Sequence, residues 1–113
     1  MTPERFRRLA LSLPDTTEVG HMGHPDFRVH GRIFATLGHP DAGFGMVKLT
    51  KDQQEAFVHA EPDVFAPVKG GWGERGATSV RLRSARTKSL RVALAAAWAN
   101  VAPRQRFERT AGR

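Results

Sequence analysis

The chain has 113 residues and a mass of 12.5 kDa, which is enough for one domain with a single modest core. It has no cysteine, which excludes a disulfide framework, a thiolate nucleophile and a cysteine-ligated zinc site. Its 18 lysines and arginines against 11 acids give a net charge of +7, which favours a polyanion such as nucleic acid as a partner. Arginine-rich proteins also carry such an excess without binding a polyanion, so charge alone does not decide the function.

The sequence contains no apolar run long enough to span a bilayer. Residues 92–99 come nearest, and their short, alanine-rich sequence predicts part of a buried helix. The first eight residues carry charges without a following apolar stretch, so we do not expect a secretory signal there. The resulting expectation is a cytoplasmic protein that does not contact a membrane.

The first predicted element is a helix that Thr2 caps and Pro14 ends. Its apolar residues recur at helical spacing and form one stripe: Phe6, Leu9, Ala10 and Leu13. A weaker strand pattern follows over residues 16–22.

Residues 27–37 alternate between apolar and polar side chains and predict an antiparallel hairpin. A two-residue turn at residues 30–31 would put Phe27 and Phe34 on one face, whereas a three-residue turn would pair Phe27 with Ile33. We prefer the three-residue turn, because it gives one continuous apolar row. That row is Phe27, Ile33, Ala35 and Leu37, and the opposite row is Arg28, Arg32, Phe34 and Thr36. A slip of one residue would exchange the two faces, so the register decides where the cations point.

The second half of the chain predicts two further strands and two further helices. Residues 44–49 form a strand with Met46 and Lys48 outward, and residues 78–83 form a strand with Arg81 and Arg83 outward. A capping box of Thr50 and Gln53 begins one helix, and Thr87 caps the last helix. Residues 64–67 are extended and residues 70–76 form a flexible loop. The last helix has an apolar stripe of Leu90, Leu94, Ala97 or Trp98, and Val101.

These elements indicate the α+β class. We expect a single-domain two-layer sandwich in which helices cover one face of a mainly antiparallel sheet. The domain spans residues 1–103, and residues 104–113 form a basic, flexible C-terminal tail.

Residues 71–76 match the pattern G-x-G-x-x-G, but a dinucleotide site needs this loop between a strand and a helix. Here a strand follows the loop, so we do not expect a dinucleotide cofactor. The loop does offer two cations, Lys69 and Arg75, beside the ring of Trp72, and this set suits a phosphate backbone with bases nearby. Trp72 fits equally well as a ring that folds back onto the core, and the sequence leaves both interpretations open.

Five histidines suggest a metal site, but the close pair His21 and His24 has no third ligand at a fixed spacing. Surface histidines are the simpler interpretation, so no metal ligand is predicted. The chain has no cysteine, no tyrosine and no serine in a nucleophile elbow. We therefore predict no catalytic residue and no cofactor.

The remaining candidate site consists of outward-facing sheet residues: Arg28, Arg32, Phe34, Lys48, Arg81 and Arg83. Under the preferred register these residues form a basic face with one aromatic ring, which can contact phosphates and stack on a base. A solvated strand face that resists aggregation accounts for the same residues.

Several segments resemble the MmcQ/YjbR family. They are L-A-L-S-L-P at residues 9–14, F-R-V-H-G-R-I-F-A at residues 27–35, V-K-L-T at residues 47–50, and G-W at residues 71–72 ahead of V-R-L at residues 80–82. The resemblance covers most of the chain and implies a compact domain similar to CyaY, with a sheet covered by helices. It also implies DNA binding through a double-wing surface, with no known enzymatic activity or cofactor. The glycine-rich loop before Val80 and the basic tail depart from the family pattern.

The leading hypothesis is a DNA-binding module with low sequence specificity. Its expected phosphate contacts are Arg28, Arg32, Lys48, Lys69, Arg75, Arg81 and Arg83, and its expected stacking residues are Phe34 and Trp72. One alternative is a protein–protein interaction domain, a homodimer or adaptor, that uses an apolar sheet face. Another is a small-molecule-binding or enzymatic domain that uses residues 70–76.

Overall fold

The computed structural model describes residues 1–20, 24–39 and 41–102. The helices are α1 (Pro3–Leu11), α2 (Lys51–Ala60), α3 (Gly71–Glu74) and α4 (Thr87–Val101), and a 3₁₀ turn, η1 (Leu82–Ser84), precedes α4. The strands are β1 (Thr16–Val19), β2 (Asp26–Val29), β3 (Arg32–Leu37), β4 (Phe44–Lys48), β5 (Phe65–Pro67) and β6 (Ala77–Arg81).

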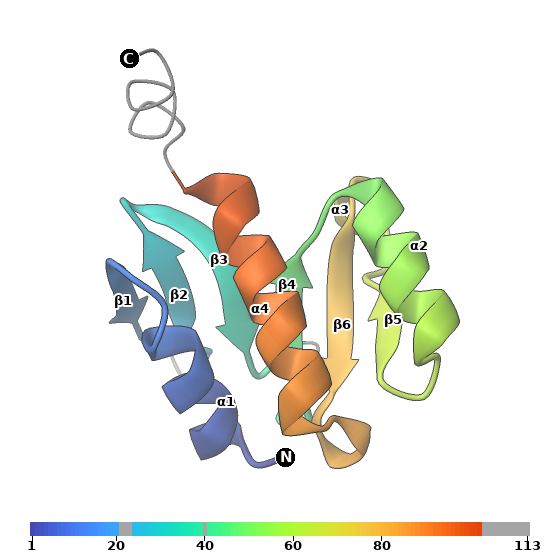
Figure 1. Ribbon diagram of the computed structural model, residues 1–113, viewed down its shortest axis with the longest axis horizontal. Helices are drawn as coiled ribbons and strands as arrows, with labels where there is room; N and C mark the ends of the chain where they lie inside the picture. Colours follow the sequence, from blue (N-terminus) through green and yellow to red (C-terminus); the bar gives the residue numbers. More distant parts are fainter. Residues whose placement is uncertain (21–23, 40, 103–113) are drawn as a thin grey trace.

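The six strands form one antiparallel sheet in the order β1-β2-β3-β4-β6-β5. Helices α1, α4 and α2 lie side by side on one face of this sheet (Figure 1). Helix α4 packs on β3 and β4 and contacts α1, whereas α2 packs on β5 and β6. The predicted α+β class, with helices on one face of an antiparallel sheet, is confirmed.

Helices α1 and α2 begin where the sequence predicts, because their caps are local. The Thr2 hydroxyl accepts a hydrogen bond from the Arg5 amide at 3.1 Å. Thr50 and Gln53 form the predicted capping box, with one bond in each direction between side chain and backbone. The predicted apolar stripe of α4 is buried at Leu90, Ala93, Leu94, Ala97 and Val101.

Strand register determines which side chains face the helices. The row formed by Leu37, Gly45, Val80 and Phe65 lies on the helix-covered face. Gly45 allows α1 to approach the sheet, since a Cβ atom there would lie 2.7 Å from the Phe6 ring. The row one residue along, on the opposite face, is Thr36, Met46, Ser79 and Ala66.

The turn between β2 and β3 differs from the one we preferred from the sequence. Val29 pairs with Arg32, so the turn has only two residues. These residues, His30 and Gly31, have positive φ angles of 51° and 82°, as the common two-residue hairpin turn requires.

A β-bulge then restores the apolar row on the helix-covered face. Arg28 pairs with Ile33 but Phe27 pairs with Ala35, so Phe34 is an extra residue in β3. The bulge turns Phe34 into the core, where its side chain is completely buried. The preferred register was therefore wrong, and so was the outward position of Phe34. Arg32 pairs with Val29 and Ile33 pairs with Arg28, so the faces expected for Arg32 and Ile33 were wrong as well.

Three other expectations need correction. Residues 71–74 form the short helix α3 rather than part of a flexible loop. The buried Gln54 amide holds this segment, because it donates hydrogen bonds of 2.9 Å to the Gly73 and Ala77 carbonyls. The final strand ends at Arg81, so Arg83 lies in η1. Arg86, not Thr87, occupies the N-cap of α4.

Some expectations fall outside the described residues. The strand predicted over residues 16–22 is present as far as Val19, and Met22 and His21 are not described. The tail over residues 104–113 is likewise not described.

Candidate nucleic-acid interface

The predicted nucleic-acid contacts do not form one surface. Arg28 and Arg32 lie on the β2–β3 hairpin. Four other predicted residues lie near α3, at the end of β6 where that strand begins: Lys48, Lys69, Trp72 and Arg75. Arg81 and Arg83 lie at the end of β6 and in η1. Phe34, in the core, presents no ring surface for stacking.

Arg28 is the most constrained of these cations. Its side chain is 28% exposed, and its Nη2 atom lies 3.2 Å from Oδ2 of Asp26. Its Nε atom is buried without a hydrogen-bond partner. This ion pair neutralises much of the charge that a phosphate would meet, so Arg28 is a poor contact.

Trp72 packs against another loop. Its ring is half-buried and meets the His39 ring edge-on, with centroids 6.0 Å apart. Lys69 and Arg75, on either side of α3, are exposed. These two cations are available to a ligand, but part of the Trp72 ring is already used in packing.

The cations at the end of β6 lie together with two more that the sequence analysis did not select. Arg81, Arg83, Arg86 and Lys88 line an open groove of about 780 Å³, and all four are exposed. We call this feature the basic groove. Its other lining residues are Glu61, Pro62, Asp63, Val64, Ser84 and Ser89.

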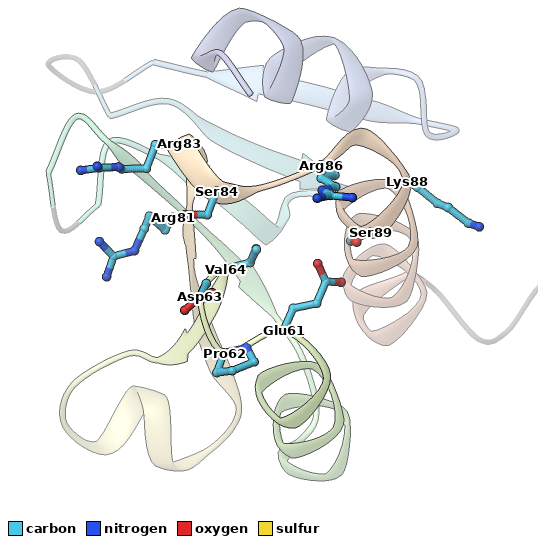
Figure 2. A pocket seen from close by; sticks show the side chains of 10 residues that line it. All are labelled: Glu61, Pro62, Asp63, Val64, Arg81, Arg83, Ser84, Arg86, Lys88 and Ser89. Atoms are coloured by element: carbon cyan, nitrogen blue, oxygen red, sulfur yellow. The ribbon is translucent and has the colours of Figure 1, made fainter.

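The cations approach the basic groove from different directions. Figure 2 shows Arg81 and Arg83 pointing away from α4, Arg86 at the start of α4, and Lys88 extending outward past that helix. The Arg81 guanidinium lies over the Phe44 ring, 5.6 Å from its centroid, and this cation–π contact restricts where the charge can move. The turn of η1 brings Arg83 and Arg86 to the same groove.

The start of α4 adds to the positive character of the basic groove. The Arg86 side chain makes no capping hydrogen bond, and the first turn of α4 contains no acid. The first intrahelical bond runs from the Leu90 amide to the Arg86 carbonyl at 3.0 Å, so the amides of residues 87–89 precede it. These amides and the helix dipole both favour an anion at this end.

Two acids also line the basic groove. Glu61 points toward Arg86 from the opposite wall, and Asp63 lies beside Val64 (Figure 2). Among the described residues, the ion pairs within 4.0 Å involve none of the groove side chains. The four cations are therefore available to an external anion, and they exceed the two acids.

A sequence signal for this groove was present but was not used. Residues 81–91 contain five cations and no acid, which is more cations than any other stretch of eleven residues before residue 103. Strand alternation predicts Arg81 and Arg83 as outward cations, whereas Arg86 and Lys88 lie at the start of α4, where strand alternation gives no signal.

Two further kinds of site, a metal centre and a membrane span, can be checked in the part of the chain that the structure describes. Among the described residues, no three histidines or acids are placed to hold a metal ion. No helix there is both long and apolar enough to cross a membrane.

Comparison with known proteins identifies a solved structure with a similar fold and a matching sequence family. A solved structure of the Deinococcus radiodurans protein DR2400, described as a DUF419 domain, superposes with a TM-score of 0.72 at 18% identity and covers 88% of this chain and 78% of its own. No curated protein matches the sequence. The sequence model of YjbR matches residues 11–100, which is most of the chain, so this protein belongs to the YjbR family.

Proposed function

We propose that this protein binds nucleic acid, with DNA as the expected partner, through contacts to the phosphate backbone and with low sequence specificity. The observation that supports the proposal is the basic groove, where four exposed cations surround an open cavity of about 780 Å³. Arginine and lysine contacts to phosphate release counterions and carry little sequence information.

The position of the groove supports a backbone ligand rather than a single small anion. Its cations come from the end of β6, from η1 and from the first turn of α4, so they are spread along the groove. Spread cations match a repeating polyanion, because successive phosphates can each meet a different side chain. Lys69, Arg75 and Arg32 are secondary contacts in this proposal.

The test is fluorescence anisotropy of labelled DNA with two double variants that change the net charge equally. Arg83→Glu with Arg86→Glu alters the basic groove, and Arg32→Glu with Arg75→Glu alters exposed cations elsewhere. Titrations at about 50 and 200 mM salt report the number of phosphate contacts. We expect the groove variant to lose at least about tenfold in affinity, or about 1.4 kcal/mol, with a shallower salt dependence.

The second double variant should lose much less. Equal losses in the two variants would mean that net charge alone attracts the DNA and that the groove is not the interface. No binding by the unmodified protein at about 50 mM salt would refute the proposal. Melting temperatures of all variants establish that each one remains folded.

A further inference from the structure

A second, apolar groove opens beside the basic groove. It has a volume of about 330 Å³ and lies between α2 and α4. Ala56, Phe57 and Ala60 form its α2 wall, and Ser89 and Val92 form its α4 wall. We call it the apolar groove.

One large apolar side chain of the apolar groove is exposed. Val92 is 57% exposed, which makes it the exposed large hydrophobic residue of the described chain. The buried apolar residues of α4 lie on its other side, at Leu90, Ala93, Leu94, Ala97 and Val101. Val92 therefore adds accessible apolar surface to the groove, which is the kind of lining that ligand sites have.

Hydrogen bonds join α4 to α2 and β4 at residues that do not line the apolar groove. The Asn100 amide of α4 donates to the Gln53 side chain at 2.8 Å and to the Lys48 carbonyl at 3.0 Å. At the other end of α4, Glu61, Lys88 and Ser89 line both grooves. The apolar groove therefore adjoins the basic groove at the end of α4 that lies away from Asn100.

The α2 wall of the apolar groove contains an aromatic ring. Phe57 is half-buried, and its ring packs edge-on against the buried Phe65 ring, with centroids 5.1 Å apart. A ring held in this way offers a fixed apolar surface for a flat ligand group.

We propose that the apolar groove receives one unstacked base of a single-stranded nucleic acid whose phosphates lie in the basic groove. The inference rests on the proposed function, and it adds that the protein prefers single-stranded nucleic acid to a duplex. Charge complementarity supports this occupant: an apolar site continuous with four cations fits a molecule that carries a flat apolar group beside an anion. Lys88, at the boundary between the grooves, is placed to contact the phosphate of the inserted nucleotide.

The apolar lining of this groove is the reason for the preference for a single strand. A base in a duplex is paired and stacked, and moving it into the apolar groove costs the energy of unstacking and unpairing it. A base in a single strand does not require that cost, and base–aromatic contacts tolerate any base. The preference therefore adds strand selectivity without adding sequence specificity.

The test compares a labelled oligothymidylate of about 12 nucleotides with the corresponding duplex, because single-strand sites commonly span about 4–16 nucleotides. Ala60→Leu fills the apolar groove without changing the charge, at an exposed helical position that accepts leucine. Ala95→Leu makes the same change at an exposed position of α4 outside both grooves. We expect tighter binding of the single strand, a loss of about tenfold in Ala60→Leu and no loss in Ala95→Leu.

Duplex affinity should be the same in all three proteins. Equal affinity for single strand and duplex, with no effect of Ala60→Leu, would overturn this inference and leave the proposed function standing. An equal loss for both ligands in Ala60→Leu would also overturn base insertion, because a duplex cannot use the apolar groove. No binding of either ligand would refute the proposed function itself.

Discussion

Glu61 is an acidic residue in the basic groove, where we propose that the phosphates of a nucleic acid bind. Its carboxylate faces Arg86 across the basic groove without forming an ion pair within 4.0 Å (Figure 2). A carboxylate in this position repels an incoming phosphate and lowers the affinity for nucleic acid, while keeping the unoccupied groove from being purely positive.

Neutralising Glu61 should therefore strengthen binding. In Glu61→Gln we expect the affinity for DNA to rise about two- to fivefold, the range that one exposed charge contributes. Anisotropy titration at low salt measures this change. Glu55→Gln, at an exposed α2 position outside the grooves, is the matched control and should leave the affinity unchanged. A gain of the same size in both variants would show that only net charge matters.

Gln54 shows, at the same scale, why part of the fold is not readable from the sequence. Its neighbours on α2 give no hint that its amide is buried and donates to the Gly73 and Ala77 carbonyls. Two glycines within Gly71–Glu74 predict a flexible loop, since glycine disfavours helix. The tertiary hydrogen bonds from Gln54 outweigh that local preference.

Among the elements, α4 begins in an unusual way. The N-cap position favours serine, threonine, aspartate or asparagine, yet Arg86 occupies it and makes no capping bond. Stability alone would not select arginine there. The proposed function supplies a reason, because an arginine at this position places a cation and the free helix amides at the same point of the basic groove.

Replacing Arg86 should separate stability from binding. In Arg86→Ser the new hydroxyl can cap α4, and we expect the free energy of unfolding to rise by about 1 kcal/mol. DNA affinity should fall at the same time, because one groove cation is lost. Urea denaturation and anisotropy titration measure the two effects, and Arg91→Ser, on the exposed side of α4 outside the grooves, is the control. If stability and affinity moved in the same direction, Arg86 would be a structural residue.

Helices that depend on local signals were predictable, and elements that depend on distant contacts were not. The caps at Thr2 and at Thr50 with Gln53 lie within four residues of the groups they satisfy. The bulge at Phe34 depends on how β3 fits between β2 and the helices above it, so alternation alone gave the wrong register. The candidate site was likewise only half predicted, because η1 bends the chain between Arg81 and Arg86 and brings together cations that no single periodicity connects.

At the scale of the whole molecule, the positive charge is unevenly divided along the sequence. Residues 104–113 contain four arginines and one glutamate, and so hold three of the seven net charges. A basic segment of this kind can attract DNA by itself, which would obscure the contribution of the folded part.

Deleting residues 103–113 separates the two contributions. The deletion begins after Ala102, the C-cap of α4, so every described helix and strand is kept. We expect DNA binding to persist with lower affinity and a shallower salt dependence, because fewer cations release counterions. Anisotropy at about 50 and 200 mM salt measures both quantities. Complete loss of binding at the lower salt would show that the basic groove has no affinity of its own.

The bulge at Phe34 also bears on how relatives of this chain can be compared. The alternation of inward and outward side chains along β3 shifts by one residue at Phe34. A relative that lacks the extra residue would align correctly only with a gap at this position. A gap placed elsewhere would exchange core and surface residues along part of the strand, and at 18% identity to a solved neighbour such an error would pass unnoticed without superposed backbones.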